Sequence, residues 1–425
     1  MKFETKDYNS YTINLCNIKK FKTIELWLNI KTPIKKEEIT IRKILFSVLF
    51  HSTKEYSSPK EISIKLEDLY SSYITESVYR EGKFLLTEVL LSCLEDKYTE
   101  ENNFEEAIKL LSEILFNPKI ENESFDEKIV NLYKERLKTS IENIKEVPAR
   151  YAHTRGLEEH DKNSITSYRM IGYIEDLDNI DGKTLYKYYK KIIKTNLFDF
   201  YVIGNITFNK LSPIIKKYFN KIDIISRKNT NVFLNDKIIK KAKTTKESIA
   251  FEQSILKMYF KFDKVTKHER LFYIKILSLI LGNVPGLLFD KVREKHSLCY
   301  SISGRYSYYD NILCITTNIS KENYEKVRKL INETIKDITK QKFSNEILED
   351  KKNLAINFYE NLDSSSQNLK SYMVETYTLE LMDKDEIIKN IKKITKNDIV
   401  KVAKKIKLES VYFLEGVKDE KAWND

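Results

Sequence analysis

Glycine is scarce in this chain, with only nine glycines among 425 residues. The loop patterns G-x-S-x-G, Walker A and G-x-G-x-x-G need glycines at fixed spacings, because the backbone there turns sharply or approaches a ligand closely. None of these patterns occurs in the sequence. We therefore expect neither a nucleophile-elbow hydrolase, nor a P-loop NTPase, nor a dinucleotide-binding enzyme.

Cysteine and long apolar runs are lacking as well. Cys16, Cys93, Cys299 and Cys314 are widely spaced and form no C-x-x-C pair, so we interpret them as reduced, packed thiols of a cytoplasmic protein. No uninterrupted apolar run reaches the length of about 18 residues that spans a membrane. Because no apolar segment follows the early Lys2, no secretory signal is expected either.

The charge is unbalanced, since 74 Lys and Arg residues against 63 Asp and Glu residues give a formal net charge of +11. The excess is mostly Lys scattered along expected helix faces, and Lys lacks the planar fork that favours base and phosphate recognition. We therefore expect no nucleic-acid partner. The positive charge would suit an acidic peptide or an acidic partner surface, and compositional drift explains it equally well.

The length suggests two domains of roughly 200 residues each, and the chain repeats itself at about half its length. Segments 21–51 and 254–283 each run from an alternating strand through a polar turn into an amphipathic helix. Both halves close with a Lys-rich helix and an apolar strand that ends in glycine, Gly204 and Gly416. This similarity at both ends predicts duplicated domains.

Alternation in segments 74–94 and 298–320 predicts one antiparallel strand pair in each half. The expected fold class is α+β, with two homologous domains that each pack helices on one face of an antiparallel or mixed sheet, like a clam with two similar shells. The polar stretch 224–248 lacks helical periodicity, so we place a linker there. The predicted domains are residues 1–223 and 249–425.

Long helices are expected between these strands. Residues 317–379 predict three helices, with breaks near Lys342 to Phe343 and near Asp363 to Ser366, where serines can cap the third helix. A helix that begins with acidic residues near 121–127 carries an apolar stripe, which we interpret as a core face and not as a binding site. The stripe consists of Ile129, Leu132, Tyr133, Leu137 and Ile141.

The stretch from Leu287 to Asn318 joins a helix end, a basic elbow and two strands. It places Arg293 and Tyr300 seven residues apart at the mouth of a sheet. A guanidinium can bind a backbone carbonyl or a carboxylate, and a phenol can add a hydrogen bond beside an apolar ring. The pair therefore suits the binding of an extended peptide.

This stretch resembles the second-domain signature L-F-x-x-x-R-E-x-x-x-L-x-Y-S of the insulinase-like (pitrilysin, mitochondrial-processing-peptidase-type) zinc peptidases. The resemblance covers about residues 10–417 and implies that Arg293 and Tyr300 hold substrate or an oxyanion opposite a zinc ion. Ser297 replaces the family's usual glycine, as in the inactive partners of the bacterial two-subunit members, each of which forms half of a closed chamber. The matching residues are Leu288, Phe289, Arg293, Glu294, Leu298, Tyr300 and Ser301.

Members of that family bind zinc through H-x-x-E-H on the first long helix, where two histidines share one helix face and the glutamate polarises water. The register of the following segment places Lys43 at the first histidine of this motif, Phe46 at the glutamate and Ser47 at the second histidine. The resemblance puts the family's further glutamate ligand near Lys134, with an uncertainty of one residue. We therefore expect no metal in this chain and a zinc ion in a partner subunit.

The histidines and Cys299 offer further candidate sites. His153 and His160 lie two helical turns apart and, with Glu158 or Glu159, are candidates for a relocated metal site, although surface or capping roles are favoured. We interpret His51 as a polar helix end. Cys299 and His296 would need improbable geometry to form a nucleophile pair, so a packed thiol is favoured for Cys299.

The resemblance implies a non-catalytic, substrate-binding subunit of a heterodimeric zinc peptidase that cleaves small peptides, including leader or precursor peptides. On this hypothesis the chain has no activity alone and pairs with a homologous H-x-x-E-H subunit. Two alternatives stay open: a peptide-binding or scaffold protein without a role in proteolysis, and a self-sufficient peptidase with a metal at His153 and His160.

Overall fold

The computed structural model describes residues 2–100, 102–222, 231–234, 238–239, 241–282, 284–381 and 383–417. It forms two compact units, each of which takes one segment from the other half of the sequence. Unit 1 consists of Met1–Glu142, Met170–Val232 and Leu362–Leu381, and unit 2 consists of Asn143–Arg169, Phe233–Asn361 and Met382–Asp425.

Unit 1 is built on a six-stranded sheet with the strand order β1-β2-β6-β3-β5-β4. The β2 and β6 strands run parallel, and all other neighbours are antiparallel. The predicted strand pair in 74–94 is confirmed as β4 and β5, so β4 forms one edge of the sheet. The strands are β1 (Lys2–Asp7), β2 (Tyr11–Asn17), β3 (Thr23–Pro33), β4 (Tyr73–Glu81), β5 (Phe84–Leu94) and β6 (Leu197–Gly204).

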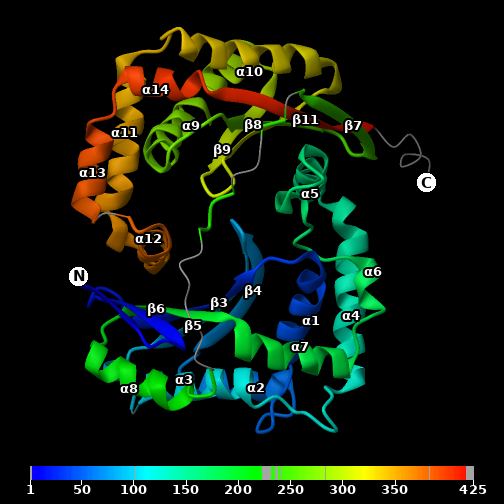
Figure 1. The fold of residues 1–425 in the computed structure, drawn as a ribbon, viewed down its shortest axis with the longest axis vertical. Coiled ribbons are helices and arrows are strands. Elements are labelled where there is room, and N and C mark those ends of the chain that lie inside the picture. Colours follow the sequence, from blue (N-terminus) through cyan, green and yellow to red (C-terminus); the bar gives the residue numbers. More distant parts are fainter. Residues whose placement is uncertain are drawn as a thin grey trace. The chain divides into compact units, whose positions relative to one another are not determined.

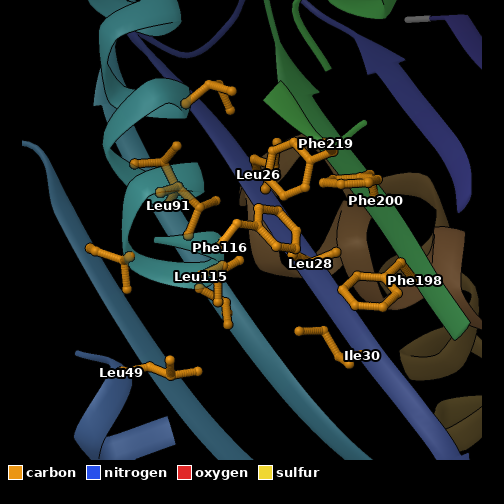
Figure 2. Packing of buried hydrophobic residues seen from close by; sticks show 14 of the residues in the cluster. Leu26, Leu28, Ile30, Leu49, Leu91, Leu115, Phe116, Phe198, Phe200 and Phe219 are labelled. Atoms are coloured by element: carbon orange, nitrogen blue, oxygen red, sulfur yellow. The ribbon is translucent and has the colours of Figure 1, made fainter. Parts of the chain in front are cut away.

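Helices cover one face of this sheet and bury an apolar core. Leu26, Leu28 and Ile30 of β3 alternate toward the helices, where they meet Phe116 and Phe219 (Figure 2). Figure 1 shows α3, α7 and α8 on this side of the sheet. The helices of the unit are α1 (Ile39–Leu49), α2 (Pro59–Asp68), α3 (Asn103–Phe116), α4 (Glu127–Glu142), α6 (Ile174–Leu177), α7 (Gly182–Thr195), α8 (Phe208–Tyr218) and α12 (Ser366–Leu379).

Unit 2 repeats this plan with a five-stranded sheet of order β7-β11-β8-β10-β9. Again one pair, β7 and β11, is parallel and the rest are antiparallel. The predicted strand pair in 298–320 is confirmed as β9 and β10, and β9 forms an edge of the sheet as β4 does in unit 1. The strands are β7 (Lys243–Ala250), β8 (Ser254–Phe262), β9 (Cys299–Ser307), β10 (Ile312–Ile319) and β11 (Ile406–Val417).

Helix α9 packs closely on β9 in unit 2. A Cβ atom added to Gly282 at the end of α9 would lie 1.9 Å from the backbone nitrogen of Gly304, so two of the chain's few glycines permit this approach. The helices are α5 (Pro148–His160), α9 (Ile274–Gly282), α10 (Tyr324–Thr339), α11 (Asn345–Glu360), α13 (Lys384–Lys392) and α14 (Lys396–Ala403), with π-helical turns at Glu269–Tyr273 and Phe289–Glu294 and 3-10 turns at Asn143–Glu146, Ile165–Ser167 and Lys321–Asn323. Unit 1 contains the 3-10 turns Lys36–Glu38, Asp96–Tyr98 and Leu362–Ser364.

The two units exchange one helix with each other. Helix α12 packs on the face of the unit 1 sheet opposite the other helices, where Tyr377 meets Tyr201 of β6 and Lys370 forms an ion pair with Glu88 of β5 at 2.5 Å. Its counterpart α5 packs on the sheet of unit 2, where Ala152 joins a cluster with Tyr259 of β8. The exchange could not be read from the local sequence pattern.

The expected α+β fold with two similar halves is confirmed, and the exchange corrects its linear boundaries. Predicted domain 1–223 includes α5, which belongs to unit 2, and predicted domain 249–425 includes α12, which belongs to unit 1. The predicted linker 224–248 overlaps β7, which begins at Lys243 and pairs with β11. Much of that linker, residues 224–230, 235–237 and 240, lies outside the described residues.

The helix predictions in 317–379 are confirmed as α10, α11 and α12, and the side chain of Ser365 caps α12 by accepting a hydrogen bond from the Asn368 N–H group. The stripe predicted on α4 is wrong at one position. Leu132 is 39% exposed, whereas Val130, which the stripe omitted, is fully buried. The helix therefore presents a slightly rotated face to the core.

Candidate functional site

The predicted elbow in unit 2 is a π-helical turn, Phe289–Glu294, followed by β9. The turn closes with hydrogen bonds from the Ser297 N–H to the Arg293 carbonyl at 2.8 Å and from the Leu298 N–H to the Val292 carbonyl at 3.1 Å. Ser297 has a φ of 52°, in the left-handed region. That conformation favours glycine, the usual residue of the resembled signature at this position.

A β-bulge determines how Tyr300 is presented. In the pairing of β9 with β10, Ile302 lies opposite Thr317 and Cys299 lies opposite Ile319. Tyr300 and Ser301 therefore share the single partner position of Asn318, which is the defining feature of a bulge. Both side chains are exposed, and Tyr300 reaches 80% exposure.

The structure brings the predicted pair together at this bulge. The guanidinium carbon of Arg293 lies 5.8 Å from the centroid of the Tyr300 ring, which is within cation–π range. The arginine comes from the last turn of the π-helix and the tyrosine from the strand, so the hydrogen-bonded elbow determines their separation. A cation and a phenol are thus displayed side by side next to a sheet edge.

A polar strip extends from Tyr300 along the same sheet. Register pairs Arg305 of β9 with Cys314 of β10, and Lys257 of β8 with Thr316 of β10, so these side chains share one face. The ammonium of Lys257 donates to the Thr316 hydroxyl at 3.1 Å. Burial lowers the pKa of Lys257, and the nearby Arg305 adds to this effect.

Lys257 and Arg305 were not singled out from the sequence. The available signal was a lysine within β8, a strand in which every residue is buried. Alternation in that strand places Lys257 on the side of Tyr259 and Lys261, away from the apolar face. Which cations would lie near it depends on strand order and register, which the sequence alone did not give.

In unit 1, the residues at the expected metal-ligand positions do not fit a zinc ion. Phe46 is 1% exposed and belongs to the apolar core, and Lys43 and Ser47 are half-buried on α1. Burial raises the pKa of Glu76 on β4, and the ammonium of Lys43 acts to lower it. An ammonium, a phenyl ring and a hydroxyl supply none of the imidazole or carboxylate donors that zinc prefers.

The expected position of the further glutamate ligand shows the same replacement. Lys134 of α4 donates to the Ile180 carbonyl oxygen at 2.8 Å, and the adjacent Glu135 is exposed. His51, just after α1, bonds through Nδ1 with the Tyr133 hydroxyl at 3.1 Å. Across the part of the chain that the structure describes, no group of three or more His, Cys, Asp and Glu side chains is placed to hold a metal ion.

Comparison with known proteins agrees with these observations. Residues 179–355 match the family described as peptidase M16 inactive domain. The probable inactive metalloprotease YmfF of Bacillus subtilis is 24% identical over 413 residues, which cover 96% of each chain. The chain is therefore similar to M16 peptidases. The helix on which the resemblance expects the metal motif, α1, carries none of its ligands.

Solved structures share this fold. A conserved protein from Enterococcus faecalis V583 is 24% identical, with a TM-score of 0.88 over 98% of this chain and 99% of that one. A peptidase M16 inactive domain from Pseudomonas fluorescens is 13% identical, with a TM-score of 0.80 over the same shares of the two chains. In the described residues, moreover, none of the helices is long and apolar enough to cross a membrane.

The relocated metal site considered for this chain does not fit the structure. His160 is buried, its Nδ1 lies 2.9 Å from the Ser410 hydroxyl and its Nε2 lies 3.1 Å from a Glu409 carboxylate oxygen. His153, on the same helix, is exposed. The surface or capping role favoured for His160 is also wrong, because its ring stacks on Tyr259 in the interior of unit 2.

The second candidate, a nucleophilic pair of Cys299 and His296, is not supported either. Cys299 is buried and His296 is exposed. Burial raises the pKa of the Cys299 thiol, which disfavours the thiolate that a nucleophile requires. Both observations agree with the packed thiol favoured from the sequence.

Proposed function

We propose that this chain is the non-catalytic, substrate-holding subunit of a two-subunit zinc peptidase that cleaves small peptides. Arg293 and Tyr300 would bind the peptide backbone or stabilise the charge that develops on the carbonyl oxygen. The zinc ion and the general base would come from a homologous subunit with an intact H-x-x-E-H motif.

One observation carries this proposal: the elbow of unit 2 keeps the cation and phenol side by side, while α1 of unit 1 has lost the metal ligands. Arg293 lies next to an 80% exposed Tyr300, and tyrosine and arginine are enriched among the residues that contribute most to binding at protein interfaces. Phe46, by contrast, has become part of the core. The chain keeps the Arg293 and Tyr300 pair but not the metal ligands. This favours a peptidase in which one chain binds the substrate and another holds the zinc ion.

The edge position of β9 supports an extended peptide as the ligand. An edge strand presents backbone N–H and C=O groups, so an extended peptide can add to it as a further strand. The bulge at Tyr300 interrupts regular pairing at this edge and directs two side chains outward. We propose that β9 aligns the peptide and that Arg293 and Tyr300 contact it.

A homologous zinc-bearing partner and a cytoplasmic location are also part of this proposal. Bacillus subtilis contains both the relative named as a probable inactive metalloprotease and one named an uncharacterized zinc protease, which is 24% identical to this chain over 253 residues covering 58% of each. Such a pair supports a homologous zinc-bearing partner. All four cysteines of the chain are free thiols, three of them buried, which supports a cytoplasmic location.

Reconstitution tests the proposal. Peptide cleavage should be measured for this chain alone, for an H-x-x-E-H homologue from the same genome alone, and for the two mixed, with zinc quantified in each protein. We expect cleavage only in the mixture and zinc only in the homologue. A mixture no more active than the homologue alone would favour the scaffold hypothesis instead.

A further inference from the structure

We propose that Lys257 and Arg305 form a carboxylate-binding subsite in unit 2, which selects peptides that carry an acidic residue. This inference rests on the proposed peptide-holding function and adds a substrate class to it. The subsite lies on the strip that runs from the bulge at Tyr300 along β9, with Arg305 on the edge strand and Lys257 two strands further into the sheet.

Lys257 and Arg305 lack a counter-charge among the described residues. Among the residues that the structure describes, neither Lys257 nor Arg305 forms an ion pair, and the Thr316 hydroxyl is the hydrogen-bond partner of the Lys257 ammonium. An ammonium has three donors, and an almost fully buried one without a carboxylate is unfavourable. Lys257 is only 6% exposed, so it bears this cost within the folded protein.

Other buried lysines of the chain show how such charges are normally balanced. Lys261, four residues further along the same face of β8, lies 3.7 Å from the carboxylate of Glu409. In unit 1, Lys31 of β3 forms an ion pair with the buried Asp199 at 2.6 Å. The chain therefore supplies a carboxylate to each of these lysines but none to Lys257.

The subsite is accessible to a ligand from the side of Arg305. Arg305 is exposed, and Thr316 and Cys314 beside Lys257 are half-buried. A ligand carboxylate can contact the Arg305 guanidinium, which matches it with a two-pronged hydrogen bond. The Lys257 ammonium adds attraction from a partly desolvated position, where Coulomb interactions are screened less than in water.

The spacing of Tyr300 and Arg305 along β9 suits an extended peptide. Arg305 follows Tyr300 by five residues, and the bulge takes up one of them. Four strand steps correspond to about 13 Å. An extended peptide that pairs with β9 would therefore place an acidic residue at the subsite about four residues from the residue that lies at Tyr300.

The test uses the full chain and blocked, fluorescent ten-residue peptides in which one Glu is moved through successive positions, each compared with its Gln isostere by fluorescence anisotropy. At one position we expect Glu to bind roughly tenfold to a hundredfold more tightly than Gln. The substitution Arg305→Gln should remove most of this preference, and Lys257→Met should reduce it. Removing an exposed cation elsewhere in unit 2, by Lys326→Gln on α10, should leave the preference intact.

Further arms separate the possible outcomes. A Gln peptide with an unblocked C-terminus shows whether a terminal carboxylate binds in place of a side chain. Equal affinity for Glu and Gln peptides at every position would overturn the carboxylate subsite and leave the peptide-holding function standing. Failure of every peptide to bind would overturn both. Since Arg305 is exposed, Arg305→Gln should leave the fold intact. This variant therefore tests the subsite even if Lys257→Met does not fold.

Discussion

The guanidinium of Arg155 binds the carboxylate of Glu247 through two nitrogens, with Nη2 at 2.5 Å and Nε at 3.1 Å from Oε1. This contact joins the exchanged helix α5 to β7, the strand at one edge of the unit 2 sheet. The hydroxyls of Tyr151 and Tyr412 donate to the same carboxylate at 3.1 and 3.0 Å. A partly buried polar cluster thus holds a helix from the first half of the sequence on the second sheet.

We expect this cluster to contribute measurably to stability. Arg155→Ala should lower the free energy of unfolding by about 2–3 kcal/mol, because it leaves the Glu247 carboxylate partly buried without its cation. Urea denaturation of Arg155→Ala, Glu247→Gln and the double variant gives the coupling energy. The exposed pair of Lys190 and Glu123 is the control and should contribute under about 1 kcal/mol. A coupling energy as small as that of the control pair would show that Arg155 and Glu247 do not hold α5 on the sheet.

The packing of α5 on the unit 2 sheet should become less stable in acid. Burial raises the pKa of Glu159, but hydrogen bonds from Lys243 and Lys162 outweigh it and lower the pKa to about 2. A carboxyl with a depressed pKa in the folded state stabilises the protein fully above its unfolded pKa of about 4.3, and this contribution is lost as the pH falls toward 2.

Denaturation curves at a series of pH values check this sign. Stability should fall between about pH 4.5 and 2, and Glu159→Gln should make that fall shallower. Glu247 acts in the same direction, because hydrogen bonds from Arg155 and Tyr412 overcome burial and lower its pKa. An unchanged slope in Glu159→Gln would show that the ion pairs of α5 do not control acid sensitivity.

Restoring the metal motif should damage the fold. Phe46→Glu places a carboxylate in the apolar core and should cost about 3–5 kcal/mol. Lys43→His and Ser47→His change half-buried positions and should cost less than about 1.5 kcal/mol each. Denaturation and zinc analysis of the three single variants and of the triple variant test this. A stable triple variant that binds stoichiometric zinc would contradict the view that Phe46 is now structural.

Substitution of Ser297, whose backbone is in the left-handed region, should stabilise the chain where the preceding substitutions destabilise it. Ser297→Gly should stabilise the chain by about 0.5–1 kcal/mol, because a side chain in this conformation costs roughly 1–2 kcal/mol and the flexibility of glycine offsets part of the gain. The matched control is Ser140→Gly within α4, which should destabilise by about 0.5 kcal/mol. Loss of stability in Ser297→Gly would mean that the serine side chain supports the elbow.

Local pattern predicted much of this fold and part of its site. The strand pairs β4–β5 and β9–β10 follow from alternation and turn residues, and the resembled motif pointed to Arg293 and Tyr300, which the structure places side by side. The bulge that exposes Tyr300 was missed, because it depends on register across two strands. The burial of His160 was missed for a similar reason: its partners Glu409 and Ser410 lie some 250 residues away in the chain.

The helix exchange shows the same limit more clearly. The sequence of α5 predicts a helix, but nothing local indicates which sheet it will cover. Gly156 permits the contact, since a Cβ atom there would lie 2.2 Å from the Tyr259 hydroxyl. That reason for the glycine becomes visible only when α5 and β8 are placed together.

The most direct test of the central claim is turnover by the reconstituted pair with Arg293→Ala in this chain. Loss of one group that stabilises the developing charge should lower kcat/KM by about a hundredfold or more, while the subunits still co-elute and the partner retains its zinc. Lys326→Gln should leave kcat/KM unchanged. Undiminished turnover with Arg293→Ala in an intact complex would contradict a substrate-holding role for this chain.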